Sequence, residues 1–156
     1  MMKYTDLFEE FPDHSKVWIY QSSRPLNESE MKELETELLN FTGNWDSHGN
    51  RLAATAKVVS PYFSIVVVDQ VLVGLCGGSV DSKVRFLKEM GENLDTNFFD
   101  RMHVTISENG EDKQIHFSEL KNHTDALVYD SLITSLGDFR KGWPKAIQES
   151  NYANLV

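Results

Sequence analysis

The sequence predicts an α+β fold, with a mostly antiparallel sheet that carries its helices on one face. Two amphipathic segments, 27–43 and 79–90, alternate with short runs of strand-forming residues. Their order gives βαββαβ, the order of the ferredoxin-like arrangement, and a C-terminal extension follows. A chain of 156 residues without a linker or internal repeat suits one domain, with a lead-in at 1–14 and a polar tail at 148–156.

The first strand and the first helix have the clearest local signals. Residues 17–21, Val-Trp-Ile-Tyr-Gln, are strand formers, and Arg24-Pro25 ends them. Asn27 is the expected N-cap of the helix, and Glu30 completes a capping box three residues later. Apolar residues then recur at helical spacing up to Gly43, which we expect to be the C-cap.

A hairpin and a second helix are expected next. Residues 51–63 alternate like a strand, and Pro61 marks a bend. Residues 64–69 are too continuously apolar to have one face in water, which predicts a central strand and a hairpin around 60–62. The second helix should run from Ser79 to Met90, with Gly91 as its C-cap.

The C-terminal third contains smaller elements. Strands at 102–107 and 114–117 should form a hairpin around Asn109-Gly110, with Glu111-Asp112 lengthening the connection. Residues 126–129 suit a short strand, although a helix continuing to 136 is the alternative. A terminal helix at 135–143 precedes Pro144, and the polar tail after Ile147 is expected to be loosely held.

Composition argues against several classes of function. The 15 basic and 24 acidic residues give a net charge of -9, which disfavours nucleic acid or an anionic membrane as the main partner. A single cysteine, Cys76, allows neither an intrachain disulfide nor a cysteine zinc site. We expect neither a signal peptide nor a membrane span, because the N-terminus leads into acidic residues and no apolar run has membrane length, and we therefore expect a soluble cytoplasmic protein. No cofactor is indicated, and the expected partners are a second copy or another protein.

The strand, glycine loop and helix start at 64–82 form the first candidate site. Free N–H groups at a helix N-terminus bind anions, which makes Gly77, Gly78, Ser79 and Asp81 candidate ligand-binding residues. The loop is not a Walker A or dinucleotide-binding motif. The alternative is that the glycines only permit a tight turn and that Asp81 caps the helix.

Cys76 is the candidate nucleophile, because a helix N-terminus stabilises a thiolate. It requires a base, for which His48 and Asp69 are candidates. A lone cysteine is more often a small buried apolar residue, and Trp45 beside His48 is more often a core anchor. His103 and His116 could be neighbours on the predicted hairpin, but a metal site is not expected there.

Five segments resemble a family of short Bacteroidetes proteins that are often labelled "ABC transporter ATPase": 18–21 (Trp-Ile-Tyr-Gln), 45–49 (Trp-Asp-Ser-His-Gly), 68–69 (Val-Asp), 76–82 (Cys-Gly-Gly-Ser-Val-Asp-Ser) and 127–132 (Leu-Val-Tyr-Asp-Ser-Leu). The resemblance spans nearly the whole chain and implies one domain. The family's central segment usually reads Ser-Gly-Cys-Ser-Ile-Asp, so this chain differs by a glycine after the cysteine. The label implies nucleotide binding, which the motifs do not support.

No catalytic arrangement is complete in the sequence. We therefore expect a non-enzymatic domain for protein association or small-ligand sensing. A small cysteine-dependent enzyme using Cys76 is the first alternative, and a nucleotide-binding protein is the second.

Overall fold

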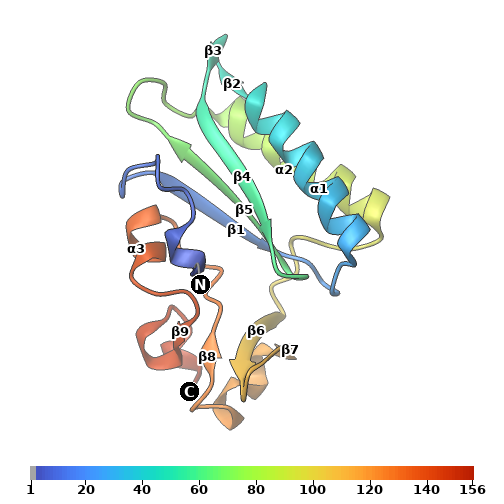
Figure 1. The fold of residues 1–156 in the computed structure, drawn as a ribbon, viewed down its shortest axis with the longest axis vertical. Coiled ribbons are helices and arrows are strands. Elements are labelled where there is room, and N and C mark those ends of the chain that lie inside the picture. Colours follow the sequence, from blue (N-terminus) through green and yellow to red (C-terminus); the bar gives the residue numbers. More distant parts are fainter. Residues whose placement is uncertain (1–2) are drawn as a thin grey trace.

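Two larger antiparallel sheets follow one another along the long axis of the molecule in the computed structural model, which describes residues 3–156 (Figure 1). A third sheet has only two short strands. This confirms the predicted α+β class. The helices are α1 (Glu28–Gly43), α2 (Gly77–Leu94) and α3 (Leu136–Arg140), with 3-10 turns η1 (Tyr4–Asp6), η2 (Phe117–Asn122), η3 (Ile147–Glu149) and η4 (Ala153–Leu155). The strands are β1 (Lys16–Gln21), β2 (Asp46–Ser47), β3 (Asn50–Arg51), β4 (Ala53–Val59), β5 (Phe63–Asp69), β6 (His103–Glu108), β7 (Glu111–His116), β8 (Leu127–Val128) and β9 (Lys145–Ala146).

The first sheet has the order β1-β5-β4, with both pairs antiparallel. This is the order of the first three strands in a ferredoxin-like sheet. The strand after α2, which would complete that sheet beside β1, lies instead in the second sheet, of order β7-β6-β8-β9. β1 is therefore an edge strand.

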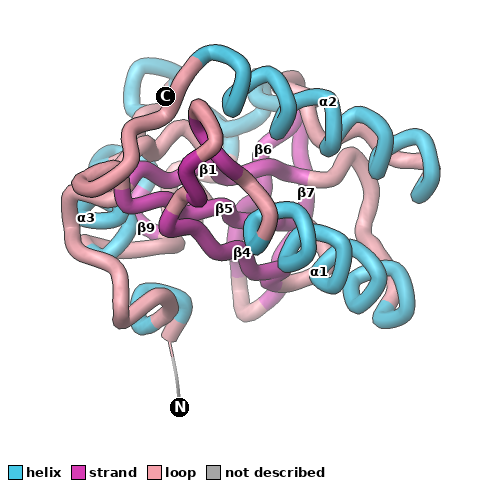
Figure 2. Tube along the Cα trace, turned by 90° about the horizontal axis from the view of Figure 1, so that it is seen from above, coloured by secondary structure: helices cyan, strands magenta, loops and turns pink. Residues whose placement is uncertain are grey.

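Helices α1 and α2 cover one face of the first sheet (Figures 1 and 2). Strand β5 is buried on both faces, as its continuous apolar run predicts. Its alternate residues Val66 and Val68 face the helices, while Ile65 and Val67 face η1, α3 and Trp143. The lead-in segment contributes Leu7, Phe8 and Phe11 to this second core.

The predicted capping box at the start of α1 is confirmed, whereas the C-cap lies one residue later than predicted. The Asn27 side chain accepts from the Glu30 N–H at 2.8 Å, and Glu30 accepts from the Asn27 N–H at 3.0 Å. Arg24 holds the same carboxylate with two N–H groups, at 3.0 and 2.5 Å. Gly43 is the last helical residue, and Asn44 takes the C-cap position expected for the glycine.

Helix α2 is longer than predicted at both ends. It begins at Gly77, two residues early, and Asp95 ends it in the left-handed region at φ 53°. Gly91, the expected C-cap, lies inside the helix. A Cβ atom there would be 2.7 Å from the Thr96 carbonyl oxygen. The glycine is therefore needed for close approach of the returning chain and not for its backbone conformation.

Both predicted hairpins form. In the β4–β5 hairpin, Ser60 turns the chain with φ 58° just before Pro61. Strands β6 and β7 are joined by a two-residue turn, with φ 54° at Asn109 and 80° at Gly110. Both positive values identify the tight type I′ class, so Glu111 belongs to the strand and does not lengthen the connection.

The C-terminal elements include the predicted short strand, β8, and helix α3, which Ser135 caps through the Asp138 N–H. The tail is more firmly held than expected. Asp130 is fully buried and accepts from the N–H and the side-chain amide of Asn151, at 2.8 and 3.0 Å. Tyr152 packs into the core of the second sheet. Within residues 3–156, no helix is both long and apolar enough to cross a membrane.

Candidate functional site

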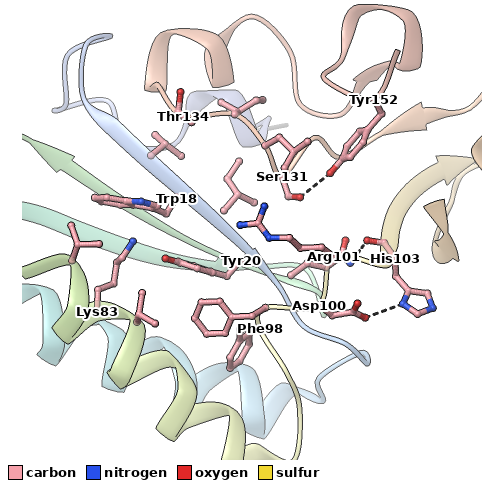
Figure 3. A pocket seen from close by; sticks show the side chains of 18 residues that line it. Trp18, Tyr20, Lys83, Phe98, Asp100, Arg101, His103, Ser131, Thr134 and Tyr152 are labelled. Atoms are coloured by element: carbon pink, nitrogen blue, oxygen red, sulfur yellow. Dashed lines mark hydrogen bonds and ion pairs between the residues drawn. The ribbon is translucent and has the colours of Figure 1, made fainter. Parts of the chain in front are cut away.

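A cavity of about 590 Å³ lies along the free edge of β1, where a fourth ferredoxin-like strand would stand. Its walls come from β1, α2, residues 98–103 and residues 131–134, with Tyr152 at one side (Figure 3). We call it the β1 cavity. Most of its lining is apolar or aromatic, which is typical of a small-molecule site.

The ends of the β1 edge are closed by other parts of the chain. The Val17 N–H donates to the Thr134 carbonyl at 3.0 Å, and Lys16 forms an isolated bridge with Ser135. At the other end, Gln21 bridges Phe99. In an antiparallel pair, the N–H and C=O groups of every second residue point to the same side of the strand. Ile19 lies between these contacts and two residues after Val17, so its backbone groups also point away from β5. Its N–H and C=O therefore face the cavity.

Lys83 is the unusual residue of the β1 cavity. The buried stripe of α2 consists of Ser79, Lys83, Leu87, Met90, Gly91 and Leu94, so the lysine occupies a core position. Only 1% of Lys83 is exposed, and its Nζ lies 3.5 Å from the Trp18 ring centroid and 5.2 Å from that of Tyr20. Among residues 3–156, no carboxylate forms an ion pair with it. A lysine this buried normally has such a partner.

Burial and, to a smaller extent, the charge of Lys16 together lower the pKa of Lys83 to about 7. Both cations lie over the same ring, with the Lys16 Nζ 5.4 Å from the Trp18 centroid. The electron-rich face of Trp18 acts in the opposite direction, because it attracts the ammonium form. The amine is thus easily deprotonated near neutral pH, and any bound anion would favour its protonated form.

The opposite end of the β1 cavity carries Asp100, Arg101 and His103. The Asp100 carboxylate accepts from the Met102 N–H at 2.8 Å and contacts His103 Nδ1 at 2.9 Å. Burial alone would raise the pKa of Asp100, but these hydrogen bonds lower it overall. Among the described residues, Asp100 is the only carboxylate in the cavity lining, and its bonds hold it at the margin.

Arg101 is exposed, and its guanidinium extends toward the middle of the β1 cavity (Figure 3). Its charge acts on both neighbouring phenols. Burial raises the pKa of Tyr20, and Arg101 partly offsets that rise. For Tyr152, burial again raises the pKa, and Arg101 is among the groups that oppose it. The cavity thus presents Lys83 and Arg101 to a ligand in a chain whose net charge is -9.

The predicted residues around Cys76 form a separate group beside the start of α2. Cys76 is the N-cap of that helix and is partly exposed. Its Sγ lies 3.1 Å from Ser79 Oγ, which donates to the Asp46 carbonyl at 2.6 Å. The hydroxyls of Ser47 and Ser79 and the Ser79 N–H lower the pKa of Cys76 to about 6, and the charge of His48 adds a smaller effect.

The other candidates of the glycine loop do not gather around a ligand position. Gly77 and Gly78 are exposed in the first turn of α2, whereas Ser79 is buried and already bonded. Asp81 is exposed and does not cap the helix, whose N-cap is Cys76. Neither Gly77 nor Gly78 has a positive φ, and a Cβ atom at either position would have room, so a tight turn does not require these glycines.

Asp69, the second candidate base for Cys76, bonds elsewhere. Its carboxylate lies 3.3 Å from His14 Nε2 and accepts from the Val71 N–H at 3.0 Å. His103 and His116 are cross-strand neighbours, as expected, with ring centroids 5.7 Å apart. Within residues 3–156, no group of three ligating side chains could hold a metal ion. Trp45 is the expected core anchor, and its indole N–H donates to the Ser79 carbonyl at 2.9 Å.

Comparisons with known proteins do not assign the β1 cavity a role. No family model, curated protein sequence or solved structure matches this chain. The evidence for a function is therefore the geometry of the chain itself.

Sequence reasoning missed Lys83, although a signal was present. Met90 and Leu87 fix the buried stripe of α2, and counting back one turn from Leu87 reaches Lys83. Val80 and Val84 form an alternative apolar stripe with Leu87 and Met90, and this stripe does not include Lys83. Arg101 lies in a loop and had no periodic signal.

Proposed function

We propose that the protein is a non-enzymatic binding domain for a small organic anion with a flat, apolar body, held in the β1 cavity. The observation that supports this most directly is Lys83, whose amine is buried at the cavity wall and has no carboxylate partner among the described residues. A ligand anion would supply the missing counter-charge. The aromatic rings of Trp18, Tyr20 and Phe98 would pack against the apolar body.

Two further features support an anion with some length. Arg101 reaches into the β1 cavity from a different segment than Lys83, so two positive groups are available. The backbone of Ile19 lies at the same wall, where its N–H and C=O can bond polar groups of the ligand. Neither arrangement forms a complete catalytic set, which favours binding or sensing over turnover.

The first experiment is fluorescence titration with 8-anilinonaphthalene-1-sulfonate, an aromatic anion that emits strongly in apolar sites. We expect saturable binding of one dye per chain. The uncharged analogue N-phenyl-1-naphthylamine should bind at least about tenfold more weakly, because one good charge-assisted contact is worth about 1.4 kcal/mol or more. Binding of both dyes with equal affinity would contradict an anion site.

Variants locate the dye. Lys83→Met and Arg101→Ala should each weaken sulfonate binding by about tenfold or more, by loss of a charge-assisted contact. Arg85→Ala is the matched control, since Arg85 is exposed on the same helix and lies outside the cavity lining. Equal affinity in the control and in Lys83→Met would place the dye elsewhere. ATP and GTP should not compete, because the chain has no Walker A loop.

A small cysteine-dependent enzyme remains the second candidate. It is favoured by one observation: the thiol of Cys76 is partly exposed and has a pKa lowered to about 6 by neighbouring hydroxyls and an N–H group. Such a thiol is largely ionised at neutral pH. Rapid release of product from an activated thioester, abolished in Cys76→Ser, would support this role over simple binding.

A further inference from the structure

We propose that the ligand of the β1 cavity carries an aldehyde or ketone, and that the Lys83 amine captures it as a reversible imine. This rests on the proposed function, because it names the chemical class of the ligand in the same cavity. It goes beyond anion binding, since it assigns Lys83 a covalent role that a simple counter-charge does not require.

The placement of the amine supports this. A buried lysine usually either reaches water with its end or pairs with a carboxylate. Lys83 does neither among residues 3–156: it is 99% covered, and its Nζ ends 3.5 Å above the Trp18 ring, at the wall of a cavity large enough for a ligand. Desolvation and a neighbouring cation are the two conditions that activate lysine as a nucleophile, and Lys16 supplies the second.

The side chains around Lys83 can assist attack of its amine on a carbonyl group. The Tyr20 phenol end points toward Lys83 (Figure 3), and its ring centroid is 5.2 Å from Nζ. Burial raises the Tyr20 pKa, so the hydroxyl keeps its proton and can donate to the carbonyl oxygen of a ligand. Arg101 is left to bind an anionic group at the far end of the same molecule. The favoured ligands are therefore oxo acids with an aromatic or apolar body.

The chemistry balances without a cofactor or oxidant. The neutral amine of Lys83 attacks the carbonyl carbon, and the C=O π electrons move to oxygen, which takes up a proton while nitrogen loses one. The hydroxyl of the resulting carbinolamine takes up a proton and leaves as water while the nitrogen lone pair forms the C=N bond, and the nitrogen then gives up its remaining proton. Amine and carbonyl thus give imine and water, and the reverse reaction releases the ligand.

The test uses 4-formylbenzoate, an aromatic anionic aldehyde, with cyanoborohydride to reduce any imine to a stable secondary amine. Peptide mapping of the folded wild-type protein at neutral pH should find the carboxybenzyl group on Lys83 at least about tenfold faster than on Lys32, because a buried amine that deprotonates near pH 7 offers far more free base. Lys32 is exposed on α1 and serves as the internal control. The naphthalenesulfonate dye should protect Lys83 and leave Lys32 unaffected.

The outcomes separate the two proposals. Labelling that is as fast on Lys32 as on Lys83 overturns imine capture, and the binding proposal stands if the dye still binds at one site. Dye binding that is insensitive to Lys83→Met overturns the binding proposal as well. Selective labelling of Lys83 that the dye does not block also overturns imine capture of the bound ligand, because the aldehyde and the dye would then not share the β1 cavity. In Lys83→Met, the rate on Lys32 should not change.

Discussion

Replacing Lys83 by methionine should stabilise the protein at neutral pH. The two side chains have similar volume, so the change removes the charge with little repacking. Burial lowers the pKa of Lys83 from 10.5 to about 7. Each pH unit between these values corresponds to about 1.4 kcal/mol, so the full lowering is worth about 5 kcal/mol of unfolding free energy. We therefore expect a gain of up to about 5 kcal/mol below about pH 7.

The stability difference between the wild type and Lys83→Met should depend on pH. Between about pH 7 and 10.5 the unfolded chain binds a proton at Lys83 that the native chain largely does not bind. The stability of the wild type should therefore rise with pH across that interval, relative to the variant. The advantage of Lys83→Met should be complete below about pH 7 and should vanish near pH 10.5.

Urea unfolding at several pH values between 6 and 10.5 measures the difference. Lys32→Met is the control, because Lys32 is exposed and should show neither the gain nor its pH dependence. A pH-independent difference between wild type and Lys83→Met would refute the reasoning, and so would destabilisation of the variant at pH 7. Together with the dye titration, the expected result is a variant that is more stable and binds less, the pattern of a residue kept for function.

Three further predictions concern other parts of the chain. The rate of Cys76 alkylation by iodoacetamide should reach half its maximum near pH 6. Ser47→Ala should move this midpoint to higher pH, because it removes a hydroxyl that lowers the pKa of Cys76. Slow alkylation at pH 8 would show that the thiol is protected. Gly91→Ala should lower the free energy of unfolding in urea by about 1–3 kcal/mol, because the new Cβ atom would lie 2.7 Å from a carbonyl oxygen. Gly43→Ala is the control, since a Cβ atom there has open space and should cause no measurable loss. Equal effects of the two substitutions would contradict this. Asp130→Asn should cost about 1–3 kcal/mol and accelerate amide exchange at 150–152, because the buried carboxylate accepts two bonds from that segment; unchanged exchange would argue against the anchor.

The fold class could be predicted because local signals were consistent with one another. Asn27 and Glu30 fixed the start of α1, the apolar run of β5 predicted a central strand, and Asn109-Gly110 predicted a tight turn. The position of β6 could not be predicted, since strand pairing across sheets depends on long-range packing that no local pattern encodes. Gly91 was misassigned because a glycine near a helix end is normally a cap, and only tertiary structure shows the close carbonyl.

Of the two candidate sites, only the group around Cys76 was predicted from the sequence. Cys76 is recognisable from sequence because its residue type and its place before a helix both suggest chemistry. The β1 cavity depends on the absence of a strand and on a loop that brings Arg101 opposite Lys83. These are tertiary features, and the lysine itself is not distinguishable from a surface residue until the buried stripe of α2 is known.

The two outer edges of the first sheet, β4 and β1, are each partly blocked by other parts of the chain. Exposed strand edges template intermolecular pairing and fibril growth. On β4, the Val58 N–H that would recruit another chain donates to Glu35 of α1 at 3.0 Å, and Lys57 places a charge beside it. On β1, Thr134 and Phe99 occupy both ends and leave too little open strand for a neighbour to join. The same contacts that frame the cavity therefore shorten the length of β1 that is open to strand pairing.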